Sequence, residues 1–367
     1  MQMQRVNSVT TSFFGKGSIC QLPEELEKRN LKRALIVTDK FLYESYNVLP
    51  NPTVDIIKEC ITAARTLEVD LLVAVGGGSP IDTSKAVGIV LSNGGEIEQY
   101  EGVNKSKNPS IPIVAVNTTA GTGSEVTCFY VVTNPRTHSK MVMVDTNCMV
   151  SIAINDSDFM LSMPKKLTAA TGMDAMTHAI EAVLSRDASP LTDKDALWAI
   201  RTIKDFLPRV VMNGNDVEGR DMMAYAEYTA GMAFSNSGLG MVHAMAHSLG
   251  GLYNLPHGVC NSILLPYVMK FNGRSAEVQK RYKLIADALE IQGSREMTPQ
   301  VATTACIEYI KNLCRQVEIP KSFKEFNVKK EDFNALADLS MVDTCMPSNP
   351  VQPTKEEVVT IYNLACQ

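Results

Sequence analysis

The sequence predicts two domains, an α/β domain with a parallel sheet over residues 1–162 and an all-helical domain over residues 163–367. Two observations predict this division. The chain has 367 residues, which is more than one hydrophobic core usually supports. Short apolar runs alternate with helical segments in the first part, whereas long helical periodicity dominates after about Leu161.

The first domain is predicted to consist of strands that alternate with helices. Apolar runs predict strands at residues 34–38, 71–75, 113–116, 141–145 and 150–154. Helical patterns lie between the first three runs, at residues 54–66 and 80–91. Because these runs are short, continuously apolar and flanked by Gly and Asn, they are typical of a parallel sheet that is covered on both faces.

The second domain is predicted to be helical. Apolar residues recur with a helical period at residues 168–184, 191–207, 222–233, 241–249, 278–289, 301–317 and 355–364. Ser189 and Pro190 stand directly before one of these segments and are typical of a helix start.

Charge, apolar runs and cysteines narrow the class of protein. The net charge of −5 gives no broad basic surface, so nucleic acid is not an expected partner. The longest apolar runs are too short to span a bilayer, and the N-terminus has no apolar core of the signal-peptide type. Nine cysteines, odd in number and without a CxxC pair, indicate reduced thiols. We therefore expect a cytoplasmic protein that does not bind a membrane.

The first of two histidine-containing segments pairs a carboxylate with an imidazole. Asp174 and His178 are four residues apart, so on a helix both side chains lie on one face and could bind one ion. A carboxylate with neutral imidazoles suits Fe(II) or Zn(II). Taken alone, such a pair is more often an ion pair on a helix surface.

The second segment contains three histidines. His243 and His247 are again four residues apart, and either of them could join His257 at one ion if a turn brings His257 back. The residues that could break the helix in this way are Gly250, Gly251 and Pro256. The alternative is a pair of core histidines with hydrogen-bond partners. Both segments together, in a chain with only five histidines, favour a metal site.

Two loops rich in small residues follow predicted strands of the first domain. They are residues 75–82 (VGGGSPID) and 117–125 (NTTAGTGSE). Glycines at a strand-to-helix turn allow close approach of a phosphate, which the N–H groups of the helix N-terminus then bind. A tight turn would explain GGGS alone, but two such loops favour a Rossmann-like dinucleotide site. Asp39 ends the first strand, where its carboxylate could bind an adenosine ribose and favour NAD over NADP, or cap a helix.

With these residues assembled, the chain resembles the iron-activated (group III) metal-dependent alcohol dehydrogenases, and among them the 1,3-propanediol dehydrogenases and lactaldehyde (1,2-propanediol) reductases. The segments that carry the resemblance span nearly the whole chain. They are GGGSPIDTSKA at 76–86, NTTAGTGSEVT at 117–127, LTAATGMDAMTHAIEA at 167–182, GMAFSNSGLGMVHAMAHSLGGLYNLPHG at 231–258 and CMPSNPVQPT at 345–354.

The resemblance assigns roles that the spacing leaves open. It implies that the ion is held by Asp174, His178, His243 and His257. His247 would then lie near the nicotinamide and the substrate as the catalytic residue that transfers or positions a proton. Cofactor contacts are implied at Asp39, Asn51, Gly77, Gly78, Ser79, Asp82, Thr118, Thr119 and Lys140. Cys345 matches a family position near the active site, although a buried small apolar residue explains it equally well.

One connection is shorter than the family pattern. Between the predicted strand ending at Thr38 and the helix beginning at Val54, the family has a further helix and strand, for which residues 39–53 leave no room. Roughly twenty residues are missing near Ser45, by comparison with that pattern. Either the protein has lost an outer strand, or the sequence lacks a segment that the protein contains. We favour the second explanation, because nothing else in the chain looks degraded.

The expected function is that of an NAD-dependent oxidoreductase acting on a small primary alcohol or diol and its aldehyde. A divalent ion, Fe(II) or alternatively Zn(II), would polarise the substrate oxygen. Family members are typically homodimers or larger homo-oligomers. One alternative is an NAD- and metal-dependent lyase of the dehydroquinate synthase type, but the neutral, Met-rich segments around the histidines do not suit its charged substrate. The other is an inactive nucleotide-binding relative.

Overall fold

The computed structural model describes residues 6–39, 52–137 and 139–367, and it divides into two compact units, Met1–Ser162 and Met163–Gln367. Asn51 lies outside the described residues, as does the short connection near Ser45.

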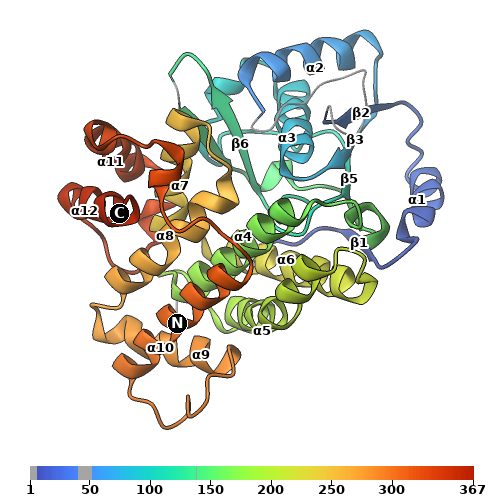
Figure 1. The fold of residues 1–367 in the computed structure, drawn as a ribbon. Coiled ribbons are helices and arrows are strands. Elements are labelled where there is room, and N and C mark those ends of the chain that lie inside the picture. The colour runs from blue at the N-terminus through green and yellow to red at the C-terminus, as the bar shows by residue number, and fades with distance from the viewer. Residues whose placement is uncertain (1–5, 40–51, 138) are drawn as a thin grey trace. The chain divides into compact units, whose positions relative to one another are not determined.

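The first unit is built on the predicted parallel sheet. Its strands lie in the order β1 (Thr11–Phe14), β8 (Ile152–Asn155), β5 (Ile113–Asn117), β3 (Leu71–Gly76) and β2 (Ala34–Thr38). All four pairings are parallel, which confirms the prediction. Figure 1 shows β2, β3 and β5 side by side, with α2 (Val54–Thr66) and α3 (Gly78–Asn93) beside them.

Both faces of the central strands β8, β5 and β3 are buried, as their continuously apolar sequences predicted, whereas Ile36 on the edge strand β2 is 58% exposed. Alternate residues such as Val73 and Val114 form a core that is covered by side chains from the N-terminal segment, among them Ile19, Leu22 and Leu26. Ile19 lies on the short helix η1 (Ser18–Gln21), and Leu22 and Leu26 lie on α1 (Leu22–Lys28). Phe13 on β1 and Leu31 after α1 pack against the same core. The intervening residues of the strands are equally buried, and α3 packs against β2, β3 and β5. Burial on both faces is what removes polar alternation from the strand sequences.

A second, smaller sheet accounts for the predicted strand at 141–145. It consists of β4 (Gly102–Val103), β7 (Ser139–Val144) and β6 (Phe129–Asn134), in that order. The pairing of β6 with β7 is antiparallel. The predicted strand therefore exists, but it belongs to this sheet and not to the parallel one.

The second unit is helical from residue 163 to residue 367, all of which is described. Its helices are α4 (Lys165–Leu184), α5 (Pro190–Met212), α6 (Val217–Ser237), α7 (Met241–Tyr253), α8 (His257–Asn272), α9 (Ala276–Ala288), α10 (Pro299–Gln316), α11 (Phe333–Val342) and α12 (Lys355–Ala365). Among the described residues, every helix is too short or too polar to span a lipid bilayer.

Helix α4 is the centre of this unit and packs against α5, α6, α8 and α9. Nearly all of it beyond Leu167 is buried, which explains why its sequence is rich in small residues and shows little amphipathic pattern. At Gly172, for example, an added Cβ would lie only 2.2 Å from Leu207 Cδ1 of α5. The neighbouring helix can approach this closely only because no side chain stands in the way.

The predicted break after the second histidine pair lies later than expected. Gly250 and Gly251 do not end the helix, because α7 continues to Tyr253. Asn254, in the left-handed region with φ 52°, ends it, and Pro256 precedes the start of α8. Asn tolerates this conformation because its short polar side chain bonds locally, so Asn254 serves as the C-terminal stop that glycine more often supplies.

Candidate functional site

Three helices of the second unit bring the predicted metal ligands together. The four-residue spacing on α4 places Asp174 and His178 on one face, as predicted. His243 lies in the first turn of α7, and His257 is the first residue of α8. The turn at Asn254 therefore returns the chain so that His257 lies near the start of α7.

The candidate ligand atoms of Asp174, His243 and His257, called here the ligand group, lie within 4.8 Å of one another. His243 Nε2 is 3.7 Å and His257 Nε2 is 3.8 Å from Asp174 Oδ1. Two protein atoms that each lie about 2.1 Å from a shared ion are roughly 3 to 4 Å apart. The spacing and the donor types of the ligand group therefore fit a divalent transition-metal ion.

His178 lies beside the ligand group but is not part of it. Its ring is stacked between Phe234, at a centroid distance of 4.3 Å, and His243, at 4.5 Å. The side chain is buried, and its ring nitrogens are not among the atoms within 4.8 Å of one another. The structure thus brings three of the four predicted ligands together and places the fourth in contact with one of them.

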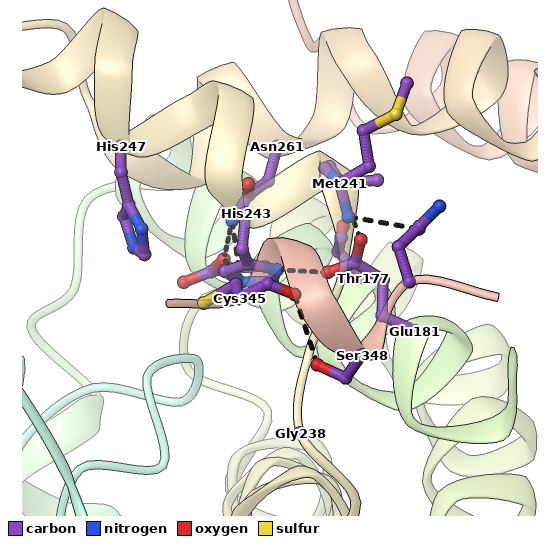
Figure 2. Close-up of polar contacts among 12 residues, drawn as sticks. Thr177, Glu181, Gly238, Met241, His243, His247, Asn261, Cys345 and Ser348 are labelled. Carbon is purple, nitrogen blue, oxygen red and sulfur yellow. Dashed lines mark hydrogen bonds and ion pairs between the residues drawn. The ribbon is translucent and has the colours of Figure 1, made fainter. Parts of the chain in front are cut away.

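Glu181 fixes the orientation of His243. Glu181 Oε2 lies 2.5 Å from His243 Nδ1 (Figure 2). Glu181 Oε1 accepts a hydrogen bond of 2.8 Å from the Val242 N–H. A carboxylate is an acceptor, so Nδ1 carries a proton, and in the neutral imidazole Nε2 keeps the lone pair that faces the ligand group. Sequence reasoning missed Glu181, although it lies seven residues after Asp174 and therefore on the same face of α4.

The ligand group contains an ionised carboxylate, which attracts a cation, and an imidazole that must lose a proton before it can bind one. Burial opposes the ionisation of Asp174, but the imidazoles of His178, His257 and His243 hold the pKa of its carboxyl group well below the ordinary value. Burial would lower the pKa of His243, but its interactions with Asp174 and Glu181 raise that pKa to about 9. A buried anion among imidazoles is the environment that a divalent ion stabilises.

His247 has a different carboxylate partner. Its Nδ1 lies 2.9 Å from Asp343 Oδ2, and Asp343 Oδ1 accepts a hydrogen bond of 2.8 Å from the Cys345 N–H. Figure 2 shows His247 apart from the contacts that surround His243. The Cys345 side chain is buried, and burial together with the charges of Asp343 and Glu181 raises the pKa of its thiol well above the ordinary value. Cys345 is therefore a protonated thiol beside the His247–Asp343 pair.

The first unit brings the two small-residue loops together. The strands β3 and β5 are neighbours in register, with Gly76 opposite Asn117, so both loops leave the same edge of the sheet. The Thr118 N–H donates to Gly76 O at 3.1 Å. An added Cβ at Gly77 would lie 2.7 Å from Thr119 Oγ1, so this glycine is what allows the two loops to touch.

Side chains of helix α3 hold the loop at residues 117–125 and the segment that follows it. Asp82 accepts hydrogen bonds from Ser124 Oγ at 2.5 Å and from the Val131 N–H at 3.0 Å. Lys85 is fully buried and donates to the carbonyl oxygens of Thr127 and Phe129 at 2.9 and 2.7 Å. Burial raises the pKa of Asp82, although Lys85 opposes this rise. Both carboxylate oxygens of Asp82 are thus engaged by the protein, and Lys85 is a supporting residue that sequence reasoning did not identify.

The remaining predicted cofactor residues lie at the same edge or on the small sheet. Asp39 directly follows β2, whose last residue is opposite Val75 of β3. Gly77 precedes α3 and Gly78 and Ser79 begin it, and the helix start has no side-chain cap. Thr118 and Thr119 follow β5, and Lys140 lies on β7. An uncapped helix start leaves N–H groups that can bind a phosphate.

Comparison with known proteins identifies the family. Residues 10–157 match the model for iron-containing alcohol dehydrogenases, and residues 168–366 match the model for the C-terminal part of that family. Alcohol dehydrogenase 4 of Saccharomyces cerevisiae is 42% identical over 374 residues, covering 96% of each chain. Lactaldehyde reductase of Escherichia coli is 40% identical over 377 residues, covering 97% of each chain. A crystal structure of a 1,3-propanediol oxidoreductase has a TM-score of 0.94 at 39% identity, covering 99% of this chain and all of the other.

The chain therefore belongs to the iron-containing alcohol dehydrogenases. It is an NAD-dependent oxidoreductase that interconverts alcohols or diols and aldehydes. Membership implies NAD and a divalent metal ion as cofactors, and the ligand group has the donors that such an ion needs.

Proposed function

We propose that the protein oxidises a small primary alcohol or diol, or reduces the aldehyde, in the manner of 1,3-propanediol dehydrogenases and lactaldehyde reductases. The observation that carries this proposal is the ligand group, in which one carboxylate and two imidazoles from three separate helices converge within 4.8 Å. Two of the similar proteins bear names that specify a three-carbon diol or hydroxyaldehyde. A family likeness at about 40% identity supports this class of substrate.

The proposed metal ligands are Asp174, His178, His243 and His257, with Fe(II) as the ion and Zn(II) as the alternative. His178 lies on the same face of α4 as Asp174 and is the proposed fourth ligand. When bound, the ion acts as a Lewis acid on the substrate oxygen. Zn(II) binds such donors more tightly than Fe(II), but it prefers a closed tetrahedral site and would support less turnover.

His247 is the proposed proton carrier. With its proton on Nδ1, His247 donates a hydrogen bond to Asp343, which leaves the Nε2 lone pair available to take a proton. A base held in one orientation can take the hydroxyl proton of an alcohol as the hydride leaves the substrate carbon for the nicotinamide. Asp343 acts through His247 and is a positioning residue.

NAD is the proposed nucleotide cofactor, bound at the carboxyl edge of the parallel sheet. The N–H groups of Gly77, Gly78 and Ser79 would bind its phosphates, with Thr118 and Thr119 beside them. Asp39, Asn51 and Lys140 are the proposed contacts to the adenosine and the riboses. Asp82 would act on the cofactor through the loop that it holds, because its oxygens are already engaged.

A substrate panel tests the proposed function. The protein is loaded anaerobically with Fe(II) or with Zn(II), and the absorbance of NADH is followed with 1,3-propanediol, 1,2-propanediol and ethanol. We expect kcat/KM to be higher for the diols than for ethanol, and kcat to be higher with Fe(II). Equal rates with all three alcohols would contradict the assignment to a diol dehydrogenase. We also expect a homodimer or larger homo-oligomer, which light scattering would measure.

A further inference from the structure

Asn261 lies among the atoms of the ligand group. It is one turn after His257 on α8, so both side chains lie on one face of that helix. Asn261 Nδ2 is 2.6 Å from Asp174 Oδ1, 3.1 Å from His243 Nε2 and 3.1 Å from His257 Nε2. It is closer to each of these atoms than Asp174 Oδ1 is to either imidazole nitrogen.

Neither the nitrogen nor the oxygen of this amide is fully matched by hydrogen-bond partners. An amide nitrogen has two N–H groups, so it cannot satisfy all three acceptors of the ligand group at once. The other end of the same amide, Asn261 Oδ1, is buried and has no hydrogen-bond partner. A buried polar atom without a partner is costly, so the position of this amide needs a physical reason.

A metal ion and the Asn261 amide compete for the Nε2 lone pairs of His243 and His257. In the tautomers that leave Nε2 of His243 and of His257 without a proton, the lone pairs that accept from the amide are the ones that would bind a metal. Once an ion takes these lone pairs, the two imidazoles can no longer accept from Asn261. The amide must therefore leave both nitrogens before the ion is fully bound.

We propose that Asn261 is a placeholder for the metal ion. In the metal-free chain its amide holds Asp174, His243 and His257 together, and on loading it is displaced from both imidazoles. This inference rests on the proposed metal site. It adds that Asn261 weakens metal binding, because its bonds to the two imidazoles stabilise the metal-free form alone. A residue that merely supports the site would have the opposite effect.

Replacing Asn261 reverses this competition. We expect N261A to bind the ion at least about threefold more tightly than the wild type, which corresponds to losing one or more hydrogen bonds from the metal-free form. The metal-free N261A protein should also melt at a lower temperature, whereas the metal-loaded forms should differ less. Affinity is measured anaerobically by competition for Fe(II) with a chromophoric chelator, and bound metal per chain by mass spectrometry.

Two further variants keep the test sharp. N261S, whose hydroxyl is one atom shorter than the amide, replaces N261A if the alanine variant does not fold by circular dichroism. S262A is the control, since Ser262 is the next residue on α8 and its hydroxyl donates to Gly258 O within its own helix. S262A should leave metal affinity unchanged.

The outcomes separate the two proposals. Tighter binding by N261A or N261S supports the placeholder. Unchanged or weaker binding, with H243A still losing its metal, overturns the placeholder and leaves the proposed metal site standing. Metal binding by the wild type that H243A does not diminish overturns both.

Discussion

His243 and His247 lie one turn apart on α7, but their Nδ1 atoms contact different carboxylates. His243 meets Glu181 of α4, and His247 meets Asp343 at the end of α11. Each carboxylate fixes the tautomer of its imidazole and the direction of Nε2. The structure therefore distinguishes a histidine that belongs to the ligand group from one that remains available for proton transfer.

Removing the charge of Glu181 should weaken metal binding. In E181Q the side chain can donate to Nδ1 of His243, which favours the tautomer with a proton on Nε2 and blocks the ligand position. Loss of such an orienting partner typically lowers metal affinity about 10- to 100-fold. The measurement is metal content after dialysis against a chelator series. D193N is the control, since it breaks the ion pair with Arg281 and tests for general destabilisation. Equal metal loss in D193N would contradict the role of Glu181.

Removing the charge of Asp343 should slow turnover without metal loss. D343N leaves His247 in place but no longer holds its proton on Nδ1, so kcat should fall while KM and metal content stay nearly constant. The fall should not exceed the loss caused by H247A, which removes a group of a kind that typically contributes about 100-fold or more. A double variant should be no slower than H247A alone, because Asp343 acts only through His247. Additive losses would contradict this.

These residue roles show where sequence reasoning ends. The spacing of Asp174, His178, His243 and His247 predicted shared helix faces, and the structure has them. The spacing could not separate His243 from His247, because their partners lie 62 and 96 positions away along the chain. Asn261 was also missed, since an asparagine on a helix face has no pattern that marks it as a neighbour of metal ligands.

At the scale of elements, the contact between α8 and α4 positions His257. Gly258 follows His257, and an added Cβ there would lie 2.3 Å from Ala170 O in the backbone of α4. The two helices can approach only because residue 258 has no side chain. This close contact is what holds His257, on α8, near Asp174, on α4.

The variant G258A tests this contact. Because the new methyl group meets backbone, α8 must move away from α4, and we expect a loss of about 1 to 3 kcal/mol in stability. His257 should move with α8, so metal occupancy should fall as well. Thermal unfolding and metal analysis measure both effects, with S262A on the same helix as the control. A G258A protein with normal stability and full metal occupancy would show that the contact is not needed.

Most elements could be predicted because their patterns are local. The helix at 54–66 has the predicted bounds, and the first three strands differ from prediction by at most one residue. Helix α8 was not predicted, because it carries Pro266 in its interior and is buried on most sides, which removes its amphipathic pattern. The strand β1 was missed because it is short and only half-buried.

For the whole molecule, the candidate ligands all come from the helical unit. A metal ion that binds only the folded state stabilises the elements that hold it. We therefore expect metal to slow hydrogen exchange in α4, α7 and α8, and to leave β3 and β5 of the other unit unchanged. Hydrogen exchange followed by mass spectrometry, with and without a chelator, makes this comparison. Equal protection of β3 and β5 would contradict a site built from the helical unit alone.

The short connection after Asp39 affects the length and the mass of the whole chain. The alignment with lactaldehyde reductase runs over 377 positions, more than the 367 residues of this chain, so the relative contains residues that this sequence lacks. If the protein contains such a segment, its intact mass will exceed 40.2 kDa by about 2 kDa, the weight of the roughly twenty residues inferred from the family pattern. A measured mass of 40.2 kDa would show that the segment has been lost.

In the proposed mechanism His243 holds the metal ion and His247 moves the proton. To separate these two roles, bound iron and NADH formation are measured in parallel for the wild type, H243A and H247A, each loaded anaerobically with Fe(II) and supplied with NAD and 1,3-propanediol. We predict that H243A loses most of its iron and its activity, whereas H247A keeps its iron and turns over more slowly. Loss of iron in H247A with retention in H243A would reverse the two assignments.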